Sequence, residues 1–313
     1  MPDKSFKTMM EEFRKAGEFT PEMVNIGGAV RPEETDRFID LVVKGNPILS
    51  RVTVDRARKL TKDVNVWDLL RGVLQRVPQG EKPDKFTSFK NVGKKLEMKD
   101  AQLFSHIPMD YLRDNQHRPG LESMVGSRLA ETYGNDVTLL AFTGTADDFS
   151  GKAFDKLNKG WPQLLKDASD SHKVDVSDHT GGTPAVVNWE GLFSAMVEQL
   201  PDVYKGDKTV FLMSRGDAEL YQRQIGQMVG GLGHLLSKQN LTYLGYEIVS
   251  LNEMPRGHVI FTPLPNLVYG VNTSMERYRE YSGEERCIKY TFDSSFDFQV
   301  AVDDAAVIAW DKP

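Results

Sequence analysis

The chain has 313 residues, and its ordinary shares of apolar (40%) and charged (27%) residues exclude collagen-like chains, wholesale disorder and disulfide-stapled scaffolds. The net charge of −6 argues against a protein whose main task is to grip nucleic acid, because such proteins usually carry a basic excess. No segment approaches the ~18 apolar residues of a transmembrane helix, so we expect no membrane partner. A single cysteine, Cys287, permits neither an intrachain disulfide nor a cysteine-built zinc site, and it fits a reducing cytosol.

Hydrophobic periodicity divides the first half of the chain into short elements. We predict a helix over 3–16, an extended arm over 20–31, a helix that begins at Pro32, a strand over 48–54, a helix over 66–77, a strand over 96–107 and helices over 109–114 and 119–141. Residues 78–95 are rich in Pro, Gly and Lys and can bury little apolar surface, so they predict a long projecting loop.

The second half of the chain shows stronger strand patterns. We predict helices over 151–169 (with a break suggested by Gly160 and Pro162), over 188–200 (capped by Asn188) and after Ser214 (capped by Ser214). We also predict a polar loop over 169–186 and strands over 209–213, 242–251, 258–262, 267–271 and 305–310. Alternating apolar residues predict a C-terminal hairpin in which strands 288–292 and 296–302 flank a turn at 293–295. Helices and antiparallel strands without regular βαβ alternation indicate the α+β class.

The polar residues give little support for an enzyme. His172, Asp175, Asp178 and His179 lie within eight residues, and imidazole and carboxylate groups suit borderline metal ions, but such a stretch is also typical of a polar surface loop. The glycine-rich residues 226–233 follow a helix, whereas a dinucleotide-binding loop follows a strand. We therefore expect no catalytic residue, no cofactor and no metal.

Lysines and aromatic rings alternate in the predicted loop. Lys82, Lys85 and Lys90 surround Phe86 and Phe89. This mixture suits either the phosphates and bases of nucleic acid or the surface of a neighbouring subunit, while a loop without a partner would leave two phenylalanines exposed. Two acidic residues dilute the basic charge, and the family resemblance given below favours the contact between subunits.

Cys287 lies in a predicted strand, between Arg286 and Ile288. Basic neighbours such as Arg286 and Lys289 can lower the pKa of a thiol. The simplest interpretation is a structural thiol, and the functional alternative is a disulfide between subunits. We therefore include Cys287 among the candidate inter-subunit contacts.

Four short motifs stand in a recognisable order along the chain. They are Asn158-Lys-Gly-Trp161, Leu244-Gly-Tyr-Glu-Ile-Val249, Asn266-Leu-Val-Tyr-Gly270 and Asp303-Asp-Ala-Ala-Val-Ile308. Together with the order of the predicted elements, they resemble the major capsid proteins of tailed bacteriophages, whose Hong Kong-type capsid fold is shared with encapsulins. The resemblance covers nearly the whole chain. The helical pattern at 66–77 departs from it, because the family has a hairpin that is mostly strand there.

The resemblance implies a division of the chain into an N-terminal arm (1–50), an extended loop (51–100), the first part of a peripheral domain with a long spine helix (101–150), an axial domain (151–274) and strands that return to the peripheral domain (275–313). Gly27-Gly28, Gly144 and Gly230-Gly231 are the candidate flexible joints between these parts. No cross-linking pair of side chains can be assigned from a motif.

The same resemblance implies a structural protein and not an enzyme. Such a chain self-assembles into pentamers and hexamers of an icosahedral shell, which encloses double-stranded DNA without sequence specificity. It assembles in the host bacterial cytoplasm and ends in the virion capsid, with a portal and, in some members, a decoration protein as partners. Because only residues 1–50 precede the loop, we expect a separate scaffolding protein in place of a fused one.

Two alternatives stay open at this point. A chain of the same fold can form an encapsulin-like compartment, which holds cargo enzymes in place of DNA. A soluble α+β enzyme that uses the cluster at 172–179 is the alternative from a different class, and it predicts a small oligomer that binds a metal ion.

Overall fold

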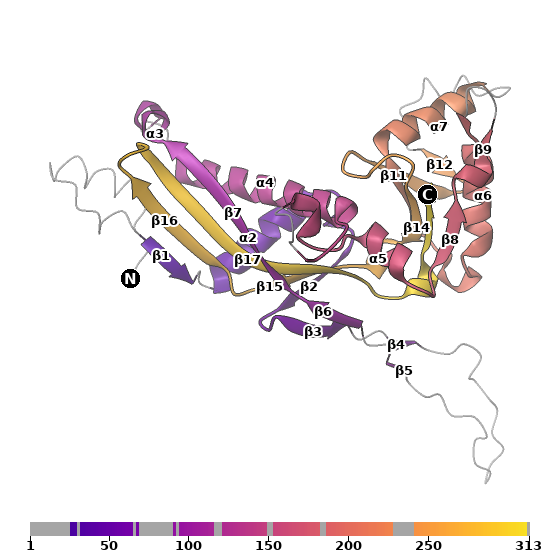
Figure 1. The fold of residues 1–313 in the computed structure, drawn as a ribbon, viewed down its shortest axis with the longest axis horizontal. Helices are drawn as coiled ribbons and strands as arrows, with labels where there is room; N and C mark the ends of the chain where they lie inside the picture. The colour runs from indigo at the N-terminus through magenta and orange to yellow at the C-terminus, as the bar shows by residue number, and fades with distance from the viewer. Residues whose placement is uncertain are drawn as a thin grey trace, which may run out of the picture.

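A computed structural model of the chain describes residues 26–29, 32–64, 67–68, 90–91, 94–115, 121–148, 153–181, 186–227 and 241–311. These residues form two six-stranded sheets, which lie toward opposite ends of an elongated molecule (Figure 1). In the part of the chain that is described, none of the helices combines the length and the apolar character that crossing a membrane requires.

The first sheet contains, in spatial order, β1 (Ile26–Ala29), β16 (Glu276–Ser282), β17 (Cys287–Val300), β15 (Leu267–Asn272) and β2 (Thr53–Ala57), and β7 (Lys99–Pro108) also pairs with β17. The pairing of β15 with β2 is parallel, and the other pairings are antiparallel. The long strand β17 organises the sheet, because residues 287–293 pair with β16, residues 296–300 pair with β15, and β7 pairs along 287–296.

Two helices, α2 (Pro32–Gly45) and α4 (Leu121–Thr143), pack on one face of the first sheet, and α3 (Met109–Asn115) continues from β7 (Figure 1). The ring of Phe38 on α2 stacks on Phe292, with 5.5 Å between centroids. The hydroxyl of Tyr133 on α4 donates to Ser294 Oγ at 3.0 Å. The even-numbered residues of β17 therefore face the helices, and the odd-numbered ones face the opposite side.

The second sheet has the order β12 (Thr242–Tyr243), β13 (Tyr246–Leu251), β11 (Thr209–Ser214), β14 (Val259–Pro263), β18 (Val307–Trp310) and β8 (His172–Asp175). Helices α6 (Trp189–Gln199) and α7 (Arg215–Gln227) cover one of its faces. Every residue of β11 is buried. Phe211 and Met213 pack under these helices, while Val210 and Leu212 belong to the larger core that continues into the first sheet. Both faces of the strand are thus covered, which its unbroken apolar sequence predicts.

Shorter elements complete the described chain. They are α5 (Trp161–Asp167), the two-stranded ladders β3 (Thr61–Val64) with β6 (Lys94–Glu97), β4 (Trp67–Asp68) with β5 (Lys90–Asn91) and β9 (Thr180–Gly181) with β10 (Val186–Val187), and the 3-10 turns Phe154–Lys156, Ser177–His179, Asp202–Tyr204, Leu264–Asn266 and Asp303–Ala305.

The α+β class and both predicted helix caps are confirmed. Asn188 Oδ1 accepts a hydrogen bond from Gly191 N at 3.3 Å and caps α6, and Ser214 Oγ accepts one from Asp217 N at 3.3 Å and caps α7. These side chains satisfy amide groups that the first turn of a helix leaves unpaired. The predicted helix over 3–16 lies outside the described residues.

The predicted turn at 293–295 is wrong, because β17 runs through it without a break. Its polar residues find partners inside the sheet, where Ser294 Oγ donates to Ala101 O at 3.3 Å and Ser295 Oγ donates to Asp100 Oδ1 at 2.6 Å. The hairpin lies instead between β16 and β17, and its turn is formed by residues 283–286.

Four other local predictions need correction. The predicted strand 242–251 is divided into β12 and β13 by a turn at 244–245. Residues 67–68 of the predicted helix 66–77 form β4, and the rest of that range lies outside the described residues. The predicted strand 48–54 begins with turns, in which Asn46 Oδ1 accepts hydrogen bonds from the amides of Ile48 and Leu49. The predicted loop 169–186 contains β8, which pairs in parallel with β18.

The two sheets do not coincide with the predicted domain limits at every point. Strand β15 lies in the first sheet, although residues 267–272 fall within the predicted axial domain. Strand β18 lies in the second sheet, although residues 307–310 fall within the predicted returning strands. The chain therefore crosses between the two sheets more often than the expected division implies.

Candidate functional site

Of the residues that the sequence predicts as inter-subunit contacts, the structure describes two, Lys90 and Cys287. Lys82, Lys85, Phe86 and Phe89 lie outside the described residues. Lys90 is in β5, opposite Asp68 of β4, whereas Cys287 begins β17 at the far end of the first sheet (Figure 1). Their contacts with a neighbouring subunit stay a prediction.

The ladders β3–β6 and β4–β5 form a ribbon that leads away from the body of the molecule (Figure 1). Three of the four residues of β3 are exposed. A two-stranded ribbon is at best marginally stable by itself, so its position depends on how its root is attached. In the sequence, the strands of this ribbon lie on either side of residues 69–89, which include most of the predicted projecting loop.

The root of the ribbon packs closely on the first sheet. Leu96 of β6 is fully buried, and Met98 is nearly so. Both lie over Gly270 of β15, where an added Cβ atom would come within 3.0 Å of Leu96 Cδ1. The glycine at the end of the motif Asn266–Gly270 therefore makes room for the ribbon.

Polar contacts between β6 and the end of β17 complete this attachment. Glu97 N donates to Asp297 Oδ2 at 2.9 Å, and Gln299 Nε2 donates to Lys95 O at 3.1 Å. Lys94 forms a partly buried ion pair with Asp303. Because these contacts flank the buried Leu96, they fix the direction in which the ribbon leaves the body.

Asp297 makes the ribbon root sensitive to pH. Burial raises the pKa of its carboxyl from 3.8 to about 6, although two amide hydrogen bonds act in the opposite direction. A raised pKa in the folded state means that this group favours folding below about pH 4, and that this contribution is lost as the pH rises to about 6. We expect urea unfolding from pH 4 to 7 to show the free energy of unfolding of Asp297→Asn rising relative to wild type by about 2–3 kcal/mol. If the free energies of unfolding of the two proteins change equally between pH 4 and 7, the assignment of a raised pKa to Asp297 is contradicted.

Gly144, a predicted flexible joint, is instead tightly held. Gly144 N donates to Leu140 O at 2.8 Å, and Gly160 N donates to Gly144 O at 3.0 Å. A Cβ atom at position 144 would lie 2.2 Å from Asn158 O. The glycine permits a close backbone crossing at the end of α4, and the prediction of flexibility there is wrong. Gly27 and Gly28 pair with β16, and Gly230-Gly231 lies outside the described residues.

Two further motifs of the sequence tie elements together at this crossing. Asn158 Nδ2 donates to Phe296 O at 2.8 Å, and the fully buried Trp161 donates from Nε1 to Val268 O at 3.2 Å. Asn266 Nδ2 donates to Val302 O at 2.9 Å, while its Oδ1 accepts from Val302 N at 2.8 Å. The motif residues thus join the start of α5 to β15 and β17, and the turn before β15 to the end of β17.

The side of the first sheet that faces away from α2 and α4, here called the outer face, carries exposed rings. Phe104 of β7 lies opposite Thr291, which lies opposite Tyr278 of β16. The side chains of Phe104 and Tyr278 are 63% and 41% exposed. Cross-strand neighbours on one face form a continuous row, so apolar surface is available there for a partner.

The turn between β12 and β13 presents an exposed apolar residue in a strained conformation. Leu244 is 72% exposed and has a φ of 48°, and Gly245 follows with a φ of 86°. Two positive φ values are typical of the tight hairpin turn that favours Asn-Gly. Leucine at the first position costs backbone strain and exposes apolar surface.

Cys287 is not an activated thiol. It is 6% exposed, and burial together with the nearby Glu285 carboxylate raises its pKa, although Lys289 acts in the opposite direction. The expected effect of the basic neighbour Lys289 is therefore present, but burial and Glu285 outweigh it. A disulfide between subunits stays a prediction, and the buried sulfur gives it no support.

The cluster at 172–179 is built into the second sheet. His172 Nε2 lies 3.0 Å from Asp304 Oδ1, and Asp175 Oδ1 accepts a hydrogen bond from Ser177 N at 2.9 Å. Within the described ranges, the one group of three potential metal ligands consists of His106, Glu285 and Cys287, at the other end of the molecule. Of the glycine-rich residues 226–233, those from 228 onward lie outside the described residues.

Comparison with known proteins identifies the fold. No protein-family model matches the sequence, and no curated protein matches it. Among solved structures, the chain is similar to a chain of the satellite phage P4 procapsid that includes the size determination (Sid) protein, with a TM-score of 0.68 at 12% identity, over 88% of this chain and 98% of the other. It is also similar to the capsid of the native GTA particle (TM-score 0.58, 13% identity, 100% of both chains) and to the virus-like particle of Pyrococcus furiosus (TM-score 0.50, 11% identity, 88% and 98%).

These similarities extend over nearly the full length of each compared chain, so they describe the whole architecture and not a shared substructure. At 11–13% identity these similarities establish the fold alone. The chain therefore has the Hong Kong-type capsid fold that the sequence resemblance predicts.

Proposed function

We propose that this chain is a structural major capsid protein that self-assembles into a closed icosahedral shell. The observation that carries the proposal is the full-length match to capsid chains, which include all of the native GTA capsid chain. The projecting ribbon supports it, because a ribbon that buries little within its own subunit acquires a role when it lies on a neighbour. In this proposal the chain is not an enzyme.

Contacts in several directions are what a shell requires of its subunit. The outer face offers Phe104 and Tyr278 at one end of the molecule, and the β12–β13 turn offers Leu244 at the other. The ribbon supplies a third direction, with Lys90 in β5. Such separate patches support pentamers and hexamers that are joined through further contacts, as opposed to a single dimer interface.

The contents and partners of the shell are part of the proposal. Double-stranded DNA, held without sequence specificity, is consistent with the net charge of −6, because a shell must not grip its genome tightly. A separate scaffolding protein and a portal are the partners that the family resemblance of the sequence implies. Assembly in the bacterial cytoplasm and a final place in the virion follow from this role.

An encapsulin-like compartment, which has the same fold, is the second candidate, and the similarity to the virus-like particle of Pyrococcus furiosus is compatible with either function. The contents of purified particles separate the two functions. Nuclease-protected double-stranded DNA supports the capsid, and a co-purified cargo enzyme without DNA supports the compartment.

The predicted loop gives the test of the proposed assembly. We expect Phe86→Ala combined with Phe89→Ala to reduce the yield of assembled particles in sedimentation, because the two rings then no longer anchor the loop on a neighbour. The thermal melting and far-UV circular dichroism of the separate subunit should change little. An unfolded subunit would show that the rings belong to the core, and unchanged assembly would show that they contact nothing.

A further inference from the structure

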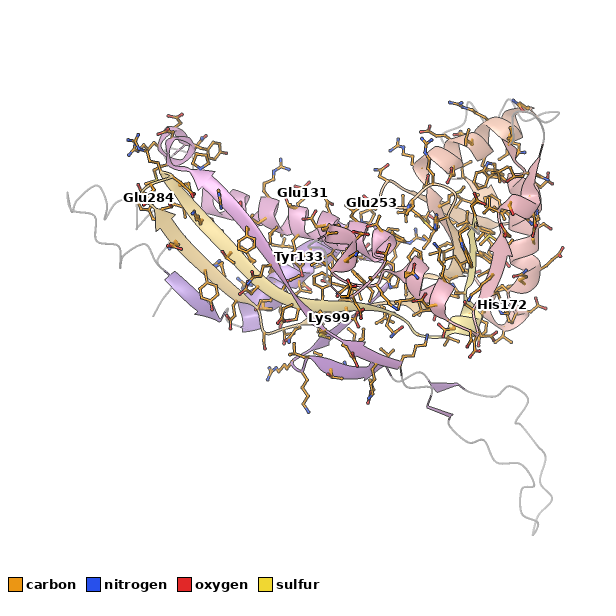
Figure 2. The ribbon with its side chains drawn as sticks, viewed as in Figure 1. Lys99, Glu131, Tyr133, His172, Glu253 and Glu284 are labelled. Carbon is orange, nitrogen blue, oxygen red and sulfur yellow. The ribbon has the colours of Figure 1, made fainter. Side chains whose placement is uncertain are left out.

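Three potential metal ligands meet at the tip of the β16–β17 hairpin. His106 comes from β7, Glu285 from the turn, and Cys287 from the first position of β17. One ligand atom from each side chain lies within 4.8 Å of the other two. In Figure 2 the neighbouring Glu284 marks this tip, at the opposite end of the molecule from His172.

The strand register explains why these residues meet. His106 lies directly opposite Lys289, and Cys287 is two residues before Lys289 on the same face of the sheet. Residues on adjacent strands that are offset by two positions are within reach of long side chains. His106 and Cys287 are therefore diagonal neighbours on the outer face.

The turn brings the third ligand into place. Arg286 has a φ of 48°, and its carbonyl oxygen accepts a hydrogen bond from Met109 N at 2.9 Å. This bond fixes the turn against the end of β7. Glu285 then reaches back over Cys287, and the Sγ atom lies 3.4 Å from Glu285 Oε2. All three ligands are thus attached to paired strands or to a turn that is bonded to them.

The ligand set selects a class of metal ion. A thiolate and an imidazole suit borderline ions such as Zn²⁺, whereas Mg²⁺ and Ca²⁺ prefer oxygen ligands alone. Around tetrahedral Zn²⁺ a sulfur and a carboxylate oxygen are about 3.6 Å apart, given the usual bond lengths. The observed 3.4 Å is close to this separation. His106 and Glu285 are exposed, so their side chains can move toward the ion without disturbing the core.

We propose that His106, Glu285 and Cys287 bind Zn²⁺ at this tip, with the fourth coordination position open to solvent. Such an ion would clamp the β16–β17 hairpin to the end of β7, independently of whether the chain forms a shell. Lys289 competes with the ion, because its Nζ lies 3.0 Å from Glu285 Oε2. Glu280 lies directly opposite Lys289 and offers that lysine an alternative partner.

Cobalt spectroscopy of the reduced, tag-free full chain tests the site. We expect Co²⁺ to bind with a stoichiometry of one, to produce a thiolate-to-cobalt charge-transfer band, and to be displaced by Zn²⁺. Cys287→Ser should abolish the band, and His106→Asn or Glu285→Gln should weaken binding by more than about tenfold. Lys289→Met should strengthen binding, because the competing cation is removed.

A matched histidine controls for binding elsewhere. His172→Gln removes a histidine that also lies beside a carboxylate, that of Asp304, but on the second sheet. It should leave both the band and the affinity unchanged. The absence of a thiolate band in the wild-type chain would overturn the proposal. A band that survives unchanged in both His106→Asn and Glu285→Gln would also overturn it, since it would indicate adventitious binding to the thiol alone.

Discussion

Replacing Gly144 with alanine is expected to prevent stable folding of the subunit. The added Cβ atom would lie 2.2 Å from Asn158 O and 2.7 Å from Gly160 N, distances that atoms in folded proteins do not reach. The backbone would have to move apart, and this would break the hydrogen bond from Gly160 N to Gly144 O. We expect the free energy of unfolding to fall by more than about 4 kcal/mol. Because a domain is typically stable by about 5–15 kcal/mol, most of the protein should become insoluble or melt far below wild type.

A second glycine provides the control. A Cβ atom added to Gly206 would have no neighbouring atom within 4 Å, and the φ angle of Gly206 is not positive. Gly206→Ala should therefore be neutral or slightly stabilising, since alanine reduces the freedom of the unfolded chain. Thermal melting of both variants measures the difference. A Gly144→Ala protein that melts close to wild type would show that the crossing at the end of α4 is looser than the structure indicates.

Replacing Leu244 with asparagine is expected to separate subunit stability from assembly. Asparagine tolerates the left-handed conformation and fits the Asn-Gly hairpin turn, so the melting temperature should rise, by an amount equivalent to up to about 1 kcal/mol. The same change removes the most exposed apolar side chain of the second sheet, and we expect assembly to fall sharply as a result. Sedimentation of the assembled fraction and melting of the separate subunit measure the two effects.

Leu244→Met is the matched variant for this test. Methionine keeps an apolar side chain at the tip of the turn and does not relieve the backbone strain, so assembly should be retained. If Leu244→Asn assembles as well as wild type, the turn contacts no neighbour, and the strain at position 244 has no role in assembly.

Helix boundaries and caps were predictable because they depend on local chemistry. Asn188 and Ser214 begin α6 and α7 where their side chains satisfy free amides. The segment 293–295 shows where local chemistry fails. Its polar residues favour a turn in isolation, but the hydroxyls of Ser294 and Ser295 are bonded to β7, which lies about 190 positions earlier in the sequence. Contacts at that separation cannot be read from local composition.

Glycine has two opposite uses that a single sequence does not distinguish. At Gly144 and Gly270 the missing side chain allows close packing, whereas the sequence pattern at Gly144 predicts a joint. The candidate metal site could not be predicted from the sequence, because its ligands come from segments about 180 residues apart. The alternation of apolar residues can indicate which face of a strand His106 or Cys287 lies on. Only the register in which β7 pairs with β17 shows that the two residues are neighbours. The predicted loop contacts remain a prediction from the sequence.

The central claim is that this subunit builds a shell. The mass distribution of the purified wild-type chain tests this claim most directly. Light scattering coupled to size-exclusion chromatography, with negative-stain images of each peak, measures it at micromolar concentration. We predict pentamers, hexamers or larger assemblies, and uniform closed shells once a scaffolding partner is added. Uniform closed shells from the chain alone would refute the separate scaffold and leave the shell intact. A stable monomer or dimer that does not assemble under any of these conditions would contradict the proposed function.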